Sequence, residues 1–329
     1  MSPMSKKDIL AVYDGIDAPY IVKTVELLNT AGVTDVHLTE QDYMWYRVNG
    51  RMTKTDVLVP IEGIMMISST VFKLGSWDRG NRACDFSGKR LRLRFSRSMK
   101  RAQLFIRTLP DRPVDINALG GKKILNDMLP DILVPGLFLV SGATGSGKST
   151  FLASYIQYLI DNYPVHIVTV EDPIEYVLQD NVGRASQREL PDDTASYDAA
   201  VRDSLREDPD VVLIGEMRDP ETANAALIAA ETGHLVLGTV HASSPIGVID
   251  RLIGMLANVP DAHLRLAQAL VGIMHLTLRI DKEKAERRCL YLSVDAEVSK
   301  LIVDKNFKEL VGKIKSDKLN DLCKAIHYA

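Results

Sequence analysis

Residues 142–149 read GATGSGKS and fit the pattern G-x-x-x-x-G-K-[ST]. The apolar run 137–140 precedes them, and a stretch with helical periodicity follows. A strand that leads through a glycine-rich turn into a helix points several backbone N–H groups, and the positive end of the helix dipole, at one place. The sequence therefore predicts a strand–loop–helix unit that binds phosphate.

Each part of this loop has an expected role. Glycines let the backbone wrap closely, Lys148 reaches the β- and γ-phosphates of a nucleotide, and the Ser149 hydroxyl is a ligand for Mg²⁺. The residues expected to line the ATP site are Gly142, Ala143, Thr144, Gly145, Ser146, Gly147, Lys148, Ser149 and Thr150. The alternative is a glycine-rich turn that holds no ligand.

Short apolar runs alternate with long helical stretches in the second part of the chain. The runs are 137–140, 165–170, 211–214 and 235–240. Continuous apolar character, rather than strict alternation, is typical of parallel strands that are buried on both faces. These residues are predicted to form an α/β domain with a mostly parallel sheet.

The first part of the chain has a different pattern. Apolar residues recur at helical spacing over 21–28, whereas 35–39 and 43–48 alternate as strands do. Asn49-Gly50 then predicts a tight hairpin, because both residues tolerate positive φ. The predicted divisions are a smaller α+β domain at 1–112, a linker with a short helix at 113–134, and a P-loop domain at 135–329 that is helical after residue 281.

An alternating segment near residue 90 places apolar residues on one face and arginines on the other. The apolar face carries Leu91, Leu93 and Phe95, and the opposite face carries Arg90, Arg92 and Arg94. Nucleotide contact, a solvated surface and nucleic-acid binding are all open readings of this face. The absence of base-stacking aromatic residues from it argues against nucleic acid.

Carboxylates follow two of the predicted buried strands. Glu216 ends the strand in DPDVVLIGEMRD, at the sheet edge where ligands bind in open α/β folds, and can meet the Mg²⁺ shell. The strand in HIVTVEDPIEY ends in Glu171, Asp172 and Glu175. Any of the three can orient a water for hydrolysis, and spacing alone does not choose among them.

Histidines stand on both sides of a third strand, 235–240. His241 follows it and is a candidate sensor of the γ-phosphate, while His234 precedes it and is the weaker candidate. A single histidine at a strand end is also a common structural residue.

Composition excludes several other classes of protein. With 43 acidic and 40 basic residues the chain has no global attraction for nucleic acid or anionic membranes. Its 3 cysteines have neither disulfide-framework nor zinc-ligand spacing. No signal peptide or membrane-spanning run is recognisable, so a cytoplasmic location is expected.

Four segments, in this order and at these separations, resemble the secretion and pilus motor ATPases of the PilT type: GATGSGKST, VEDPIEYV, REDPDVVLIGEMRD and AAETGHLVLGTVHASS. DVHLTEQDYMWYRVNGRM resembles the amino-terminal domain of that family, and FIRTLP the strand end before its linker. The resemblance implies a RecA-like P-loop core preceded by a PAS-like domain. It also implies a homohexamer on the cytoplasmic side of the inner membrane, with ATP between the two domains of each subunit.

The resemblance further implies a role for individual residues. Lys148 and Ser149 bind the triphosphate and Mg²⁺, Glu216 is the Walker B acid and a metal ligand, and Glu175 is the general base. His234 and His241 form the histidine box. Arg92 and Arg107 are the arginines that the amino-terminal domain supplies to the phosphates.

One region departs from the pilus-retraction branch. That branch has a basic motif A-I-R-x-x-I-R-E, where this chain reads CLYLSVDAEVSKLIVDKNF, and it commonly has a proline at the position of Ala143. AERRCLYL and VDAEV resemble the DotB and conjugal TraJ branch, which serves type IV secretion systems. Expected partners are inner-membrane secretion, conjugation or pilus proteins, with no sequence-specific nucleic acid. The rival functions are pilus retraction, RecA-like translocation of nucleic acid, a P-loop kinase and a structural ring subunit.

Overall fold

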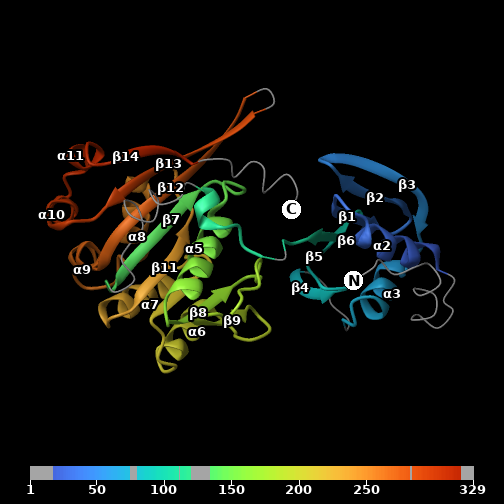
Figure 1. Ribbon diagram of the computed structural model, residues 1–329, viewed down its shortest axis with the longest axis horizontal. Coiled ribbons are helices and arrows are strands. Elements are labelled where there is room, and N and C mark those ends of the chain that lie inside the picture. The colour runs from blue at the N-terminus through green and yellow to red at the C-terminus, as the bar shows by residue number, and fades with distance from the viewer. Residues whose placement is uncertain (1–17, 75–79, 111, 120–133, 282–283, 320–329) are drawn as a thin grey trace. The chain divides into compact units, whose positions relative to one another are not determined.

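The computed structural model describes residues 18–74, 80–110, 112–119, 134–281 and 284–319. The chain divides after Asp111 into two compact units, which are described separately. Figure 1 labels the helices and strands of both.

In its described residues, the amino-terminal unit is one antiparallel sheet with two helices. Its elements are α2 (Pro19–Asn29), β1 (Val33–Thr39), β2 (Asp42–Val48), β3 (Arg51–Val59), α3 (Gly63–Thr70), β4 (Gly80–Phe86), β5 (Lys89–Ser98) and β6 (Arg101–Thr108). The strand order is β3-β2-β1-β6-β5-β4. The predicted helix and strands are confirmed, and so is the hairpin, in which Asn49 and Gly50 have φ of 48° and 77°.

The two faces of β5 differ as predicted. Leu91 and Leu93 are fully buried in the apolar core of the unit, and the arginines lie on the other face. Residues directly opposite in antiparallel strands share a face, and Arg94 is paired with Phe105.

Aromatic residues from other strands join the arginine face. Phe105 is paired with His37, and His37 with Trp45. The rings of His37 and Phe105 meet edge to face at 5.0 Å. The expectation that this face lacks aromatic residues is therefore wrong, because the sequence of β5 alone does not show which strands become its neighbours.

The second unit is built around a larger sheet. Its elements are η1 (Ile116–Leu119), β7 (Gly136–Gly142), α5 (Lys148–Asn162), β8 (His166–Glu171), β9 (Arg184–Glu189), α6 (Tyr197–Ser204), β10 (Val211–Ile214), α7 (Pro220–Glu231), β11 (Leu235–Val240), α8 (Pro245–Met255), α9 (Ala262–Ala269), β12 (Leu270–Asp281), β13 (Lys284–Ser293), α10 (Ala296–Val303), α11 (Phe307–Val311) and β14 (Lys315–Leu319). The strand order is β14-β13-β12-β7-β11-β10-β8-β9. From β12 to β9 every pairing is parallel, which confirms the predicted mostly parallel sheet.

The region after residue 281 corrects one prediction. It was expected to be helical, and α10 and α11 are, but β13 and β14 are strands that extend the sheet by antiparallel pairing. The apolar residues Cys289 and Leu292 of β13 are buried, which favours its addition to the sheet edge beside β12.

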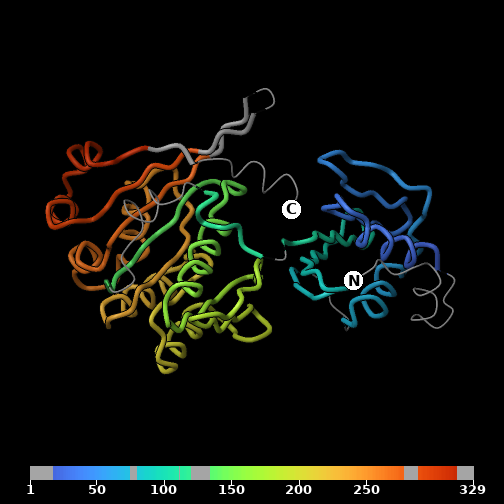
Figure 2. Tube along the Cα trace, viewed as in Figure 1, coloured from blue at the N-terminus to red at the C-terminus, as the bar shows by residue number. Residues whose placement is uncertain are grey.

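The centre of this sheet is β7, all of whose residues are buried. It lies between β12 and β11, both of which come later in the chain, as the trace in Figure 2 shows. Helix α5 lies over one face of the sheet (Figure 1), and α7 and α8 pack in the apolar core that contains Val212 and Val236. Since the strands from β12 to β9 are parallel, their carboxyl ends gather at one edge, where the phosphate loop begins.

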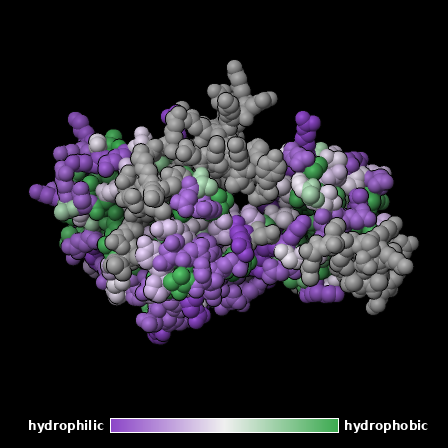
Figure 3. Space-filling view, viewed as in Figure 1, coloured by the Kyte–Doolittle hydropathy of each residue, from purple (hydrophilic) through white to green (hydrophobic). Residues whose placement is uncertain are grey.

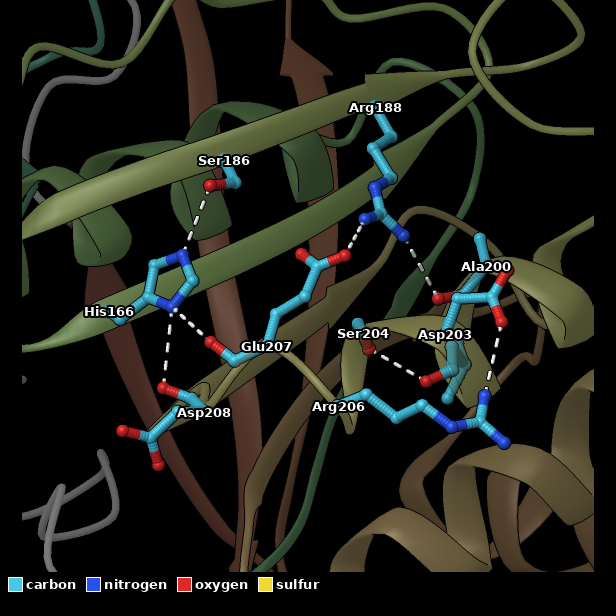
Figure 4. A network of polar contacts seen from close by, with 10 residues as sticks. His166, Ser186, Arg188, Ala200, Asp203, Ser204, Arg206, Glu207 and Asp208 are labelled. Atoms are coloured by element: carbon cyan, nitrogen blue, oxygen red, sulfur yellow. Dashed lines mark hydrogen bonds and ion pairs between the residues drawn. The ribbon is translucent and has the colours of Figure 1, made fainter.

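Polar contacts anchor the opposite edge, at the start of β8. The Nδ1 of His166 lies 3.1 Å from the carbonyl of Glu207 and 3.3 Å from that of Asp208, and its Nε2 lies 3.0 Å from Ser186 Oγ. Arg188 also donates to the Glu207 carboxylate (Figure 4). Carbonyls only accept hydrogen bonds, so Nδ1 carries the proton. The network ties the loop before β10 to β8 and β9.

Within the described ranges, the structure contains no helix that is long and apolar enough to cross a membrane. On the face shown in Figure 3, hydrophilic side chains cover most of the described surface of the P-loop unit. Apolar side chains appear there in small separate groups.

Candidate active site

The phosphate loop has the conformation that its glycines permit. Gly142, Gly145 and Gly147 have φ of 143°, 78° and 99°, values that disfavour residues with a Cβ. A Cβ on Gly142 would also lie 2.3 Å from the carbonyl oxygen of Leu276. The Nζ of Lys148 donates to the carbonyls of Gly142 and of the next residue, at 2.9 and 3.1 Å. The loop therefore forms as predicted.

The hydroxyl groups of the loop fall into two kinds. Ser149, at the start of α5, is exposed, as a metal or phosphate ligand must be. Thr144 is exposed too, as is its neighbour Ala143. Thr150 is buried, and its Oγ1 lies 2.8 Å from the Tyr176 hydroxyl, so its side chain joins α5 to the segment after β8. The contact of Thr150 with a nucleotide stays a prediction.

Lys148 lies within the field of two of the predicted carboxylates. Burial lowers the pKa of Lys148, while the negative charges of Glu216 and Glu175 raise it. The structure thus brings the lysine of the phosphate loop near two carboxylates, one just after β10 and one in the segment that follows β8.

Glu216 has a defined set of neighbours at the end of β10. Its side chain is only 15% exposed, and one carboxylate oxygen lies 3.2 Å from His241 Nε2. The other accepts a hydrogen bond from Arg218. His241 follows β11, the strand beside β10, so the two strand ends bring the Walker B acid and this histidine into contact.

The carboxylates after β8 have separate environments. Glu171 accepts hydrogen bonds from Thr169 at 2.8 Å and from Gln187 at 3.2 Å, and burial raises its pKa to about 7. Both hydrogen bonds are accepted by the same carboxylate oxygen, Oε1.

The chain that follows, including Glu175, is held against β9. Gln187 Nε2 donates to the carbonyl of Tyr176 at 2.9 Å, and the N–H of Ile174 donates to Glu189 at 3.0 Å. Among the three candidate bases, Glu175 is the one whose charge reaches Lys148.

Tyr197 was not anticipated from the sequence. It is the first residue of α6, and burial raises the pKa of its hydroxyl, as do the charges of Asp172, Glu216 and Glu171. Arg218 was also missed, although its place two residues after Glu216 was a usable signal. Tyr197 lies in a separate helix, and nothing in its local sequence indicates its position beside these carboxylates.

His234 is not brought to the phosphate loop. It precedes β11, at the edge opposite to that loop, where its Nδ1 donates to the carbonyl of Ala229 at 3.0 Å near the end of α7. This placement corrects the expected nucleotide contact within one subunit, because a parallel strand has only one end at the phosphate edge.

The two arginines lie in the other unit. Arg107 Nε donates to Asp35 Oδ1 at 2.7 Å, and Arg92 is paired with Arg107 across β5 and β6. Their action on the phosphates remains a prediction.

The residues present fit a magnesium–nucleotide complex. Within the described residues, no group of three or more His, Cys, Asp or Glu side chains forms a metal site. Mg²⁺ is commonly held by substrate phosphates, waters and one or two protein oxygens, and does not need such a cage. The exposed Ser149 hydroxyl beside the loop, with Glu216 after the end of β10, matches that mode.

A phosphate loop after the central strand, with acidic residues at the carboxyl ends of β10 and β8 in the same parallel sheet, defines a P-loop nucleotide-binding protein with a RecA-like sheet. Residues 78–319 match the family described as type II/IV secretion system protein, and the chain belongs to it. The relatives of the chain within this family include ATPases of the secretion and pilus motor class.

Individual proteins support this assignment. A type IV pilus retraction ATPase, PilT of Pseudomonas aeruginosa, is 43% identical over 175 residues, which span 52% of this chain and 50% of that protein. The chain thus matches about half the length of this curated relative. The crystal structure of the pilus retraction motor PilT with bound ADP is 31% identical, has a TM-score of 0.74, and covers 90% of this chain and 88% of its own. The Legionella pneumophila ATPase DotB has a TM-score of 0.75 and 24% identity, covers 90% of this chain and 89% of its own, and supports the fold alone.

Proposed function

We propose that this protein is a homohexameric motor that hydrolyses ATP on the cytoplasmic side of the inner membrane to power a type IV secretion or conjugation apparatus. The observation that carries the catalytic part is the convergence of Glu216 and Glu175 on Lys148. Family membership and the ADP-bound relative support nucleotide binding at this loop.

Each group has a separate task in this proposal. Lys148 leaves the loop carbonyls to bind the β- and γ-phosphates, and Glu175 orients the attacking water and accepts its proton. Bound Mg²⁺, held by Ser149, Glu216 and the phosphates, would neutralise charge on the transferring group. His241 fixes the Glu216 carboxylate from the neighbouring strand end. The products are ADP and phosphate.

The test separates binding from turnover. We expect Lys148→Ala to lose binding of a fluorescent ATP analogue, whereas Glu175→Gln and Glu216→Gln retain binding and lose about 100-fold or more in phosphate release. Glu221→Gln, at an exposed position in α7, is the matched control and should behave as wild type. Full activity of Glu175→Gln would exclude it as the base, and a wild-type protein that binds ATP without releasing phosphate would refute the ATPase proposal.

The amino-terminal unit is proposed to complete the site. Arg92 and Arg107 act on the γ-phosphate when the domains close, so hydrolysis moves one domain against the other. The hexamer follows the same family pattern and is tested by light scattering with and without ATP.

The branch assignment rests on the departures near Ala143 and in 289–307. In a host that carries this gene, its deletion should abolish effector or plasmid transfer, and wild type but not Lys148→Ala should restore transfer. Loss of pilus retraction with normal transfer would instead assign the chain to the PilT-like branch.

One observation favours a second candidate, a RecA-like translocase of nucleic acid. Trp45, His37 and Phe105 share the sheet face that carries Arg94, which combines stacking and cationic groups. Hydrolysis stimulated by single-stranded DNA, with binding that weakens steeply as salt rises, would support this candidate. Indifference to DNA would exclude it.

A further inference from the structure

A buried polar pair lies directly beneath the phosphate loop. β12 runs parallel to β7 with His275 opposite Ser141 and Leu276 opposite Gly142, so the pairing extends into the first glycine of the loop. Ser141 and His275 are 0% and 5% exposed. Ser141 Oγ lies 2.9 Å from His275 Nδ1, which makes a direct hydrogen bond between the two strands.

The loop is packed tightly against β12 at this point. A Cβ on Gly142 would lie 2.3 Å from the carbonyl oxygen of Leu276 and 2.7 Å from Ser146 Oγ. That hydroxyl is buried and has no hydrogen-bond partner. The first turn of the loop therefore lies between the backbone of β12 and the Ser146 side chain, and a small shift of β12 would displace it.

The pair also lies within the field of the catalytic lysine. Burial lowers the pKa of His275, and the positive charge of Lys148 lowers it further, so the ring is neutral near physiological pH. Lys148 in turn is bonded to the carbonyl of Gly142, the residue after Ser141. One continuous set of contacts thus links His275, Ser141 and Gly142 to the group that binds phosphate.

Packing alone does not require polar residues here. Neighbouring positions of β12 are filled by Ile273, Met274 and Leu276, all buried. Replacing both partners of a buried hydrogen bond with apolar groups of similar shape is often nearly neutral for stability. The hydrogen-bonded pair therefore has a use other than filling the core.

We propose that His275 is a positioning residue for ATP hydrolysis. It holds Ser141, and through it the first turn of the phosphate loop, and so sets the place of Lys148 without touching the nucleotide. The inference rests on the proposed ATPase function and adds β12 to the parts that build its site. Displacement of a reacting group by about 1 Å can cost about 100-fold in rate, so loss of this support is expected to lower kcat by about 10- to 100-fold.

The experiment compares Ser141→Ala, His275→Leu, the double variant and His275→Asn. We expect both single changes to lower kcat much more than they raise KM for ATP. The double variant should lose no more than the worse single one, because the two residues act as a unit. Asparagine, which retains a polar atom near the place of Nδ1, should restore most of the rate. The control is Ser204→Ala, a buried serine of α6 bonded to the carbonyl of Val201 at 2.7 Å.

Hydrogen exchange supplies a readout that does not depend on hydrolysis. Peptides spanning 141–150 should exchange faster in His275→Leu and in the double variant than in wild type. The thermal stability of the double variant should equal that of wild type. The proposal would be overturned if peptides 141–150 exchanged at the wild-type rate in these variants and the losses of kcat were additive or absent. A wild-type protein without phosphate release refutes the ATPase proposal separately, and the exchange comparison still decides the role of His275.

Discussion

Glu171 provides a stability test whose size follows from the structure. Burial at the end of β8 raises the pKa of this carboxyl from 4.5 to about 7, against the opposing hydrogen bonds from Thr169 and Gln187. A shift of this size corresponds to about 3 kcal/mol between the two protonation states. Glu171→Gln removes the ionisation and keeps the shape of the side chain.

The sign of the effect follows from proton binding. Between pH 4.5 and about 7 the folded protein holds the Glu171 proton and the unfolded chain does not, so wild-type stability falls as pH rises through this window. Above about pH 7 Glu171 is ionised in both states, so the full free-energy cost of its buried charge is present and no longer changes with pH. We expect Glu171→Gln to exceed wild type by about 1 kcal/mol at pH 5 and by about 3 kcal/mol at pH 8. Glu175→Gln should narrow the window, because the charge of Glu175 contributes to the raised pKa.

The assay must report on the P-loop unit. Both tryptophans, Trp45 and Trp77, precede residue 112, so intrinsic fluorescence follows the other unit. Calorimetry from pH 5 to 8, with hydrogen exchange of peptides from β8 and β9, is suitable. At about 2–4 °C per kcal/mol, the difference at pH 8 is about 6–12 °C in Tm. Parallel pH profiles for wild type and Glu171→Gln would refute the reasoning.

Three further changes test other parts of the molecule. Gly142→Ala should destabilise the P-loop unit by about 1–3 kcal/mol or more in a denaturant titration, because its φ and its contact with Leu276 exclude a Cβ; wild-type stability would contradict the packing described. His166→Ala should cost about 1–3 kcal/mol by the same titration while leaving ATP affinity unchanged, since its hydrogen bonds lie at the far edge of the sheet; a large loss of affinity would argue otherwise. Arg92→Ala and Arg107→Ala should each lower phosphate release by about 10-fold or more, with Arg94→Ala from the same sheet face as the control; normal kinetics in both would remove these arginines from the mechanism.

The features that could be predicted from the sequence are those encoded by local patterns. Continuous apolar runs such as 235–240 indicate buried parallel strands, and the Asn49-Gly50 turn fixes its hairpin through backbone preference alone. The phosphate loop is equally local, since a lysine, a serine and glycines at fixed spacing are sufficient to define it.

The features that escaped prediction depend on which segments become neighbours. β13 pairs with β12, and its charged residues at 284–288 obscured a strand that the sheet edge stabilises. Tyr197 reaches the carboxylates from α6, and the aromatic residues beside Arg94 come from other strands. His275 is a single polar residue in an apolar strand, and its partner is more than a hundred residues away in the chain. Local periodicity carries no information on such contacts.

Strand polarity explains why histidines near strand ends have different roles. His166 and His234 precede or begin parallel strands and so lie at the edge away from the phosphate loop, where each donates its Nδ1 proton to backbone carbonyls. His241 follows its strand, lies at the phosphate edge and faces the Glu216 carboxylate. Because parallel strands place all their carboxyl ends together, the position of a histidine before or after its strand separates a structural residue from a ligand-facing one. Applied to the segment GHLVLGTVH, this rule predicts a site role for His241, while His234 bonds the carbonyl of Ala229 near the end of α7.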